Sequence, residues 1–415
     1  MAVSLHEREQ SPSKTTSERP AGSPSIEMKS RWPRYEEDEI AAVTEVLRSG
    51  RVNALVHGER CSAFEAAFAK LCDMPHAIAL ANGTLALELA LRAFGIGPGD
   101  EVIVTPRSFV ASASCVVLSG ATPVFADVDP ISQNITAATV EAVLSPRTRA
   151  IIAVHLAGYP CALDDLAALA AHHGLRLIED CAQAHGATYN GRPVGSFGDA
   201  AAFSFCTDKI MSTGGEGGLL LLKDHDAWLR AWSFKDHGKD YARTKENVSG
   251  STFRWLHSSI GSNYRMTEMQ AAIGLRQLTK LNEWVNERRR RAALLLEALE
   301  DSPALRLTRP SQNIGHAYYK FYAFVRPERL ARGWSRDRIV AEATAAGVPC
   351  QSGICPEIYR EQAFVEAGIV PPSPLPMAQQ LGATSLMLPV DPTLSTEAVR
   401  CMGTTLSEVL AAATV

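Results

Sequence analysis

The chain has 415 residues, about the length of two or three compact domains. Hydrophobic residues make up 46% and charged residues 21%, a normal globular balance, and the formal net charge is −4. The near-neutral charge argues against a nucleic-acid-binding protein, and no apolar run in the sequence reaches the length of a bilayer span. Because the N-terminus also lacks the apolar core of a signal peptide, we expect a cytoplasmic protein without a membrane partner.

Residues 1–30 are rich in Ser, Pro and charged residues, and we predict that they form a flexible tail. A helix is predicted over residues 35–50, with Gly50 as its C-terminal stop. From residue 76 to 223, short apolar runs alternate with helical segments, which predicts an α/β fold with a mainly parallel sheet covered on both faces. The predicted strands are HAIAL (76–80), EVIVTP (101–106), TPVFADV (122–128), AIIAVHL (150–156), LRLIED (175–180), AAAFSF (200–205) and GGLLLLK (217–223). The predicted helices are TLALELALRAF (84–94), the segment around SFVASASCVVLSG (108–120) and LDDLAALAAHHG (163–174).

The pattern changes beyond about residue 265. A long helix is predicted over residues 267–299, and its arginine run, 288–291, is interpreted as a solvated face. A smaller α+β unit follows, with YYKFYAFV (318–325) as a strand and DRIVAEATAAG (337–347) as a helix. We therefore predict a tail (1–30), an N-terminal helix and large domain (31–280), and a linking helix and small C-terminal domain (281–415).

Nine cysteines are scattered without a CxxC pair. Their odd number and spacing predict neither a disulfide framework nor a zinc site, and we expect no bound metal. Cys181 and Cys206 are interpreted as small buried residues, because free cysteine is among the most buried residue types.

Two junctions between predicted strands and the segments after them carry polar residues. Gly83 and Thr84 follow Asn82 at the start of a helix, where free backbone N–H groups and the helix dipole can bind a phosphate. A plain helix cap formed by Asn82 or Thr84 explains the same residues. Asp180 closes a hydrophobic strand at the sheet edge where α/β proteins place ligands, and Gln183 follows at the same mouth. Asp180 could equally cap the next segment.

The stretch FSFCTDKIMSTGGEGG (203–218) places Lys209 between an apolar run and two glycine pairs. A triphosphate-binding loop needs the lysine after its glycines, so nucleotide triphosphate binding is not expected. A lysine beside apolar strands is a candidate for Schiff-base chemistry, and a surface lysine with a buried stem is the alternative.

The order and spacing of these segments resemble those of the DegT/DnrJ-type sugar aminotransferases, which belong to the fold-type I enzymes dependent on pyridoxal phosphate (PLP). The resemblance spans roughly residues 32–412 and leaves out only the tail. It rests on NGTLALELAL (82–91), GDEVIVTPRSFVASASCVVLSGATPVFADVD (99–129), AVHLAGYP (153–160), IEDCAQAHGATYNGRPVGSFGDAAAFSF (178–205), CTDK (206–209) with GGEGG (214–218), and NYRMTEMQAAIGLRQL (263–278).

The resemblance implies roles for individual residues. Lys209 matches the lysine bonded to PLP, and Asp180 matches the carboxylate that pairs with the pyridine nitrogen. Gln183 matches the side chain beside the phenolic oxygen, and Phe109 matches the aromatic residue stacked on the ring. Gly83, Thr84 and Ser204 match the phosphate-binding residues. Asn263 matches an asparagine that reaches the phosphate of the neighbouring subunit, which implies a homodimer with shared active sites.

The implied reaction has two halves. An amino-acid donor, glutamate in most of the family, would leave its amino group on the cofactor as pyridoxamine phosphate (PMP), and a keto sugar, typically linked to a nucleotide, would take it up. Lys209 would move the proton in both halves. Two segments depart from the family pattern, residues 50–65 and 351–359, so the sugar is not assigned. Alternatives on the same fold are a sugar dehydratase and a PLP-binding regulator without catalysis. The presence of Lys209 and the scattered cysteines argue against the former, and the complete set of Lys209, Asp180 and Gln183 against the latter.

Overall fold

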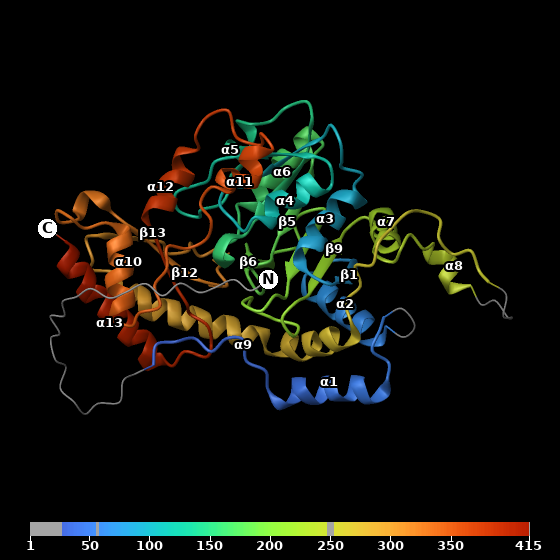
Figure 1. The fold of residues 1–415 in the computed structure, drawn as a ribbon, viewed down its shortest axis with the longest axis horizontal. Coiled ribbons are helices and arrows are strands. Elements are labelled where there is room, and N and C mark those ends of the chain that lie inside the picture. The colour runs from blue at the N-terminus through green and yellow to red at the C-terminus, as the bar shows by residue number, and fades with distance from the viewer. Residues whose placement is uncertain (1–26, 55–57, 247–252, 415) are drawn as a thin grey trace, which may run out of the picture.

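The computed structural model describes residues 27–54, 58–246 and 253–414. A seven-stranded sheet in the order β1-β9-β8-β5-β4-β2-β3 forms its centre (Figure 1). The pairs from β8 to β3 are parallel, and β9 runs antiparallel to both of its neighbours. The predicted α/β class with a mainly parallel sheet is therefore confirmed. The strands are β1 (His76–Leu80), β2 (Glu101–Val104), β3 (Thr122–Phe125), β4 (Thr148–Val154), β5 (Arg176–Asp180), β8 (Ala200–Ser204) and β9 (Gly218–Leu222).

Helices cover both faces of this sheet. The helix α3 packs across β8 and β9, whereas α2 and α7 pack against β1. The bounds of this group are α2 (Glu59–Leu71), α3 (Gly83–Ala93), α4 (Ala111–Leu118), α5 (Ala137–Glu141), α6 (Leu163–His173), α7 (His225–Lys235) and α8 (Tyr241–Lys245), with the 3₁₀ turn η1 (Leu156–Gly158). In Figure 1, α8 extends away from the body of the molecule.

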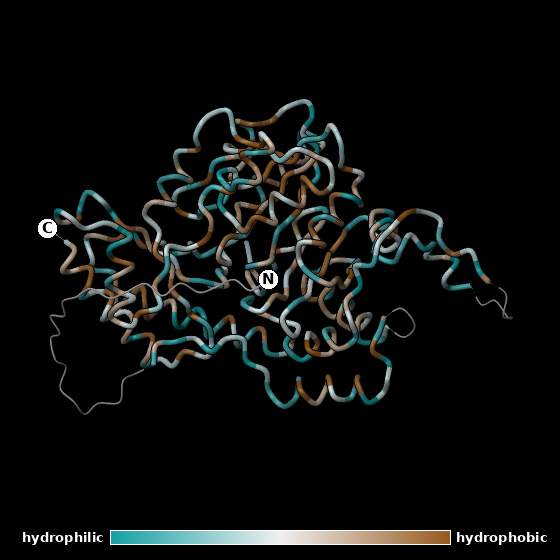
Figure 2. Tube along the Cα trace, in the orientation of Figure 1, coloured by the Kyte–Doolittle hydropathy of each residue, from teal (hydrophilic) through white to brown (hydrophobic). Residues whose placement is uncertain are grey.

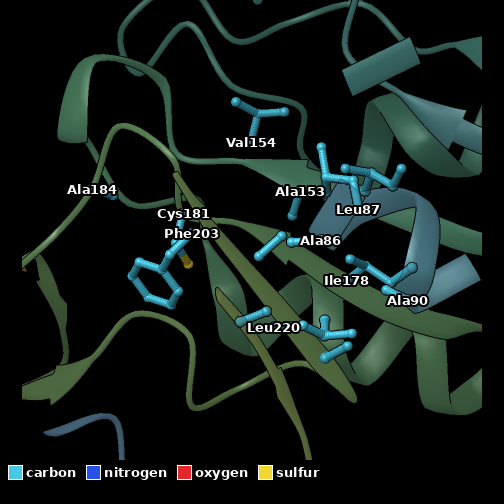
Figure 3. Close-up of a cluster of buried hydrophobic side chains, with 14 of the residues drawn as sticks. Ala86, Leu87, Ala90, Ala153, Val154, Ile178, Cys181, Ala184, Phe203 and Leu220 are labelled. Atoms are coloured by element: carbon cyan, nitrogen blue, oxygen red, sulfur yellow. The ribbon is translucent and has the colours of Figure 1, made fainter. Parts of the chain in front are cut away.

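The strands are buried because they carry few polar residues along their length. Every residue of β2, β8 and β9 is buried, which is the pattern of a sheet covered on both faces. Figure 2 shows the hydrophobic residues concentrated in the centre of the molecule. The close-up in Figure 3 shows part of the core, where α3 packs on the sheet through Ala86, Leu87 and Ala90, facing Ile178 and Leu220.

A second hydrophobic cluster lies around a three-stranded antiparallel sheet, β10-β12-β13. The elements around this sheet are β10 (Leu305–Leu307), β12 (Phe321–Val325), η2 (Pro327–Arg329), α10 (Arg336–Ala345), β13 (Ser385–Leu388) and α13 (Thr396–Ala413). Between α10 and β13 in the chain, η3 (Ile358–Arg360), α11 (Gln362–Glu366) and α12 (Pro376–Thr384) instead pack into the first cluster through Ile358, Phe364 and Leu381. A third, small sheet pairs β11 (Ile314–Gly315) with β6 (Thr188–Tyr189) and β7 (Arg192–Pro193). The predicted strand over 318–325 starts only at Phe321, because Tyr318 has a left-handed backbone with φ of 48°.

One long helix, α9 (Glu268–Leu299), runs beneath both clusters and contacts α1 (Glu37–Ser49), α2 and α13. The boundary predicted between residues 280 and 281 falls inside this continuous helix, and the division into domains stays a prediction. Residues 1–26 of the predicted tail lie outside the described residues, and 27–30 form no helix or strand. The predicted helix over 35–50 is confirmed as α1, which ends at Gly50 with φ of 68°.

The interpretation of the arginine run as a solvated face is wrong. Arg288 and Arg291 are 2% and 8% exposed, because their spacing of three residues places both on the inner face of α9. The Arg288 guanidinium lies over the ring of Trp32, and Arg291 donates to the carbonyl of Leu394. Only Arg290 of the run is exposed. Within the described ranges, no helix is both long and apolar enough to cross a membrane.

Candidate active site

A cavity of about 620 Å³ opens at the carboxyl ends of β5 and β8, beside the N-terminus of α3. This is the edge at which parallel α/β sheets place their ligands. The structure brings together seven of the eight residues predicted from the sequence, all of which line this cavity: Gly83, Thr84, Phe109, Asp180, Gln183, Ser204 and Lys209. Asn263 is not among its lining residues.

The N-terminus of α3 forms one wall of the cavity. The side chain of Asn82 caps the helix by accepting from the N–H of Leu85 at 3.0 Å, so the N–H groups of Gly83 and Thr84 precede the first hydrogen bonds of the helix. A Cβ added to Gly83 would lie 2.6 Å from Cβ of Ser204, and one added to Gly218 would lie 2.2 Å from the carbonyl oxygen of Asn82. The two glycines therefore allow the helix start to touch the ends of β8 and β9, which leaves an anion-binding niche beside Ser204.

Asp180 lies at the floor of the cavity and is 5% exposed. Its carboxylate accepts hydrogen bonds from Ser112 Oγ at 2.8 Å and from the N–H of Ala182 at 3.1 Å. Burial raises the pKa of this carboxyl above its usual range, and the two hydrogen bonds oppose that effect only in part. A cationic group beside Asp180 would therefore be bound favourably.

Gln183 is fixed by the backbone of the turn η1. Its Oε1 accepts from the N–H of Ala157 at 2.8 Å, which directs the amide and leaves its NH₂ group as a donor at the cavity wall. Ala157 has φ of 55° and Gly158 has φ of 89°. A Cβ at Gly158 would lie 3.0 Å from the carbonyl oxygen of Gln183, so only glycine fits there without displacing the turn.

Lys209 lies between two side chains that the sequence interpretation missed. Its Nζ is 3.4 Å from the Asp208 carboxylate and 3.4 Å from the Tyr319 hydroxyl. The Tyr319 hydroxyl in turn donates to Asp208. The backbone of Lys209 is held from behind, because Trp32 Nε1 donates to its carbonyl at 2.7 Å. Asp208 could have been found from the sequence, because it directly precedes Lys209. Ser112, Tyr319 and Trp32 are distant in the sequence, and only the fold brings them to the site.

The remaining predicted residues occupy different environments. Phe109 lines the cavity with 61% of its surface exposed, so one face of the ring is free to stack. Asn263 lies in an isolated bridge with Asp236 and contacts the N–H of Arg265. Cys181 is buried as predicted, but the prediction is wrong for Cys206, which is partly exposed and lines the cavity.

A second group of chemically active side chains, His155, Glu179 and Cys181, is buried beneath the sheet edge. The Glu179 carboxylate accepts from His155 Nε2 and from three backbone N–H groups of the loop at 195–198. The other ring nitrogen of His155 accepts from the N–H of Cys161. Because these polar atoms already satisfy one another, the group is best explained as a structural one that holds the loop.

The chain matches the model of the DegT/DnrJ/EryC1/StrS aminotransferase family over residues 33–407. It is 40% identical over 319 residues to GDP-perosamine synthase of Caulobacter vibrioides, and this alignment covers 76% of this chain and 81% of the relative. It is 34% identical over 372 residues to dTDP-3-amino-3,4,6-trideoxy-alpha-D-glucose transaminase of Streptomyces venezuelae, which covers 89% and 92% of the two chains. The X-ray structure of the aminotransferase from Psychrobacter cryohalolentis superposes with a TM-score of 0.90 at 48% identity, covering 92% of this chain and 99% of that one. These matches confirm the resemblance and the fold predicted from the sequence.

Proposed function

The chain belongs to the DegT/DnrJ/EryC1/StrS aminotransferase family, whose members depend on PLP, and from this membership we propose that it transfers an amino group from L-glutamate to a nucleotide-linked keto sugar. The nucleotide-linked acceptor is supported by the GDP- and dTDP-sugar names of the two curated relatives. The observation that carries the proposal is the cavity in which Lys209 lies with Asp180, Gln183 and the α3 N-terminus.

The residues present fit PLP. The niche formed by Gly83, Thr84 and Ser204 suits a phosphate, because it offers N–H groups and a hydroxyl at a helix N-terminus. Asp180, whose pKa burial raises, fits a protonated ring nitrogen that would supply the missing positive charge. The free NH₂ group of Gln183 fits the phenolic oxygen. Bound there, PLP supplies an electron sink for the carbanion formed at the donor's α carbon.

Lys209 is the only basic side chain among the described residues that line the cavity. We therefore assign to its Nζ the removal of the donor's α-proton and, in the second half-reaction, the delivery of a proton during amination of the sugar. Asp180 holds a negative charge at the floor of the site, Phe109 presents an apolar face to a ring, and Gln183 orients its amide through Ala157. The chain thus contributes positioning, one fixed charge and one proton-transfer group.

We also propose a cytoplasmic homodimer with shared active sites. Asn263 is absent from the cavity of its own chain. The preceding segment, which Arg243 of α8 contacts through a hydrogen bond to the carbonyl of Trp255, carries the exposed side chains of Phe253, Trp255 and Ile260. Exposed large apolar side chains of this kind favour burial against a second copy. Mixing inactive Lys209→Ala with inactive Asn263→Ala subunits should restore part of the activity in hybrid dimers. The absence of any restored activity in demonstrated hybrids would contradict the shared site.

The experiment that tests the function compares Lys209→Ala with the natural chain. The latter should show a visible absorbance with PLP that borohydride abolishes, and the variant should lack it. Lys223→Ala serves as a matched control, since that lysine donates to the carbonyl of Phe197 away from the cavity. An unchanged spectrum in Lys209→Ala would refute the assignment. The acceptor is then identified by adding keto sugars, with and without a nucleotide, to the PMP form and measuring the return of the visible absorbance.

A further inference from the structure

We propose that Asp208 and Tyr319 form a receiving site for the side-chain amine of Lys209 whenever that amine is not bonded to the cofactor. The two residues would act by positioning the lysine, not by touching the substrate. The inference rests on the proposed function, in which an amino donor takes the place of Lys209 and releases its Nζ.

The three side chains form a closed triangle of two hydrogen bonds and one ion pair. The Tyr319 hydroxyl donates to the Asp208 carboxylate, and its oxygen accepts from Lys209 Nζ at 3.4 Å. Nζ also lies 3.4 Å from Oδ1 of Asp208 and 5.0 Å from the centre of the Tyr319 ring. The ammonium is therefore met by a carboxylate, a hydroxyl oxygen and an aromatic ring.

Tyr319 is held so firmly that its hydroxyl has a defined place. Its ring is 6% exposed, its N–H donates to the carbonyl of Ala157 at 2.9 Å, and its carbonyl accepts from Arg288 at 3.3 Å. Ala157 is the residue whose N–H binds Gln183, so one turn positions both the amide at the cavity wall and the tyrosine beside the lysine.

The charges agree with this role. Burial acts to raise the pKa of Asp208, but Lys209 and the Tyr319 hydroxyl outweigh it and leave the pKa below its usual range. Burial, with Asp208 close by, raises the pKa of Tyr319, so its hydroxyl stays protonated and able to donate. The pair thus presents one negative charge to the lysine amine, on Asp208, and the protonated Tyr319 adds no second one.

The affinities for PLP and PMP distinguish a positioning role of Asp208 and Tyr319 from a role in packing alone. PMP carries an amine and cannot bond to Lys209, so the lysine occupies the Asp208–Tyr319 site both before and after PMP binds. When PLP binds, Lys209 would bond to it, and its amine would leave the Asp208–Tyr319 site. The site therefore opposes PLP binding and leaves PMP binding unchanged.

The test measures the dissociation constants of PLP and PMP for the apo forms of Asp208→Asn and Tyr319→Phe. Each variant should raise the ratio of the PMP constant to the PLP constant by about three- to tenfold, the expected effect of one partly exposed charged hydrogen bond. The equilibrium of the purified enzyme with glutamate and 2-oxoglutarate should shift toward the visible PLP form by the same factor. Tyr318→Phe is the matched control, because that phenol stacks on His316.

Equal weakening of PLP and PMP in both variants, or an unchanged ratio, would overturn the proposal, because a packing defect affects the two ligands alike. Thermal melts of the apo proteins identify a variant that fails to fold, and the second variant then decides. Failure of the proposed function is seen separately, as a visible absorbance that persists in Lys209→Ala.

Discussion

Replacing Gly83 by alanine tests whether the contact between α3 and β8 holds the cofactor phosphate. The added Cβ would lie 2.6 Å from Cβ and 3.1 Å from Cα of Ser204, where ordinary contacts begin near 3.4 Å. The helix start and the strand end must separate by roughly 1 Å, which costs about 1–3 kcal/mol as overpacking. Alanine favours a helix over glycine by up to about 1 kcal/mol, so the free energy of unfolding should fall by no more than about 3 kcal/mol.

The same substitution should weaken binding of the cofactor. Loss of one hydrogen bond to the charged phosphate costs about 1.5–3 kcal/mol, so we expect PLP affinity to fall by roughly ten- to a hundredfold. The assay is titration of the apo protein with PLP, read by absorbance, beside urea unfolding. Gly97→Ala is the control, since its Cβ would meet only the carbonyl oxygen of Ser119 at 3.4 Å. A PLP affinity within about threefold of the natural chain would refute the phosphate niche.

Three further changes act on the other walls of the site. Asp180→Asn should weaken PLP by about tenfold or more, through loss of a charged hydrogen bond. Burial raises the pKa of Asp180 in the folded apo protein above its unfolded value, so ionisation of this group destabilises the fold as the pH rises above about 4. At pH 7 the variant should therefore have a higher melting temperature than the natural apo protein. A lower melting temperature would contradict the direction of the pKa shift. Gln183→Leu leaves the N–H of Ala157 unpaired and should lower the free energy of unfolding by about 1–3 kcal/mol. Gln183→Glu keeps the acceptor, so it should retain stability but bind PLP more weakly. Urea unfolding measures the first effect, and PLP titration measures the second. Trp32→Phe removes the donor to the Lys209 carbonyl. It should slow the formation of the bond between PLP and the lysine, measured by borohydride reduction, with little change in the melting temperature. An unaffected rate would show that this hydrogen bond does not position the lysine.

Much of the fold could be predicted because its strands are continuous apolar runs. The segments ending at Leu80, Val104 and Asp180 are recognisable without knowledge of their neighbours. A strand that is covered on both faces is a nearly continuous run of apolar residues, so its own composition indicates that it is buried. The same property placed Asp180 and Gln183 at the cavity, because polar residues directly after such strands meet at one sheet edge.

The contacts that position Lys209 could not be predicted in this way. Trp32, Tyr319 and Arg288 are far from Lys209 in the sequence and lie in segments with no catalytic pattern of their own. Arg288 was misinterpreted because a run of arginines on a helix is usually solvated, and only the packing of α9 beneath Trp32 shows that it is buried. The family resemblance predicts that Lys209 is the reactive residue, but only the tertiary structure shows which side chains hold it.

Two acids of the site, Asp208 beside Lys209 and Asp180 at the floor of the cavity, differ in the direction in which their pKa is shifted. Asp180 is buried with only neutral donors and has a raised pKa, so its site is complete only when a cation binds there. Asp208 already has its cation in Lys209, and its pKa is lowered. On the proposed function, a cationic ring nitrogen at Asp180 would meet an unpaired charge, whereas bonding of the cofactor to Lys209 would take a positive charge away from Asp208. The apo site would then favour binding of the ring and oppose the bond to Lys209, and this opposition would help an amino donor to replace Lys209.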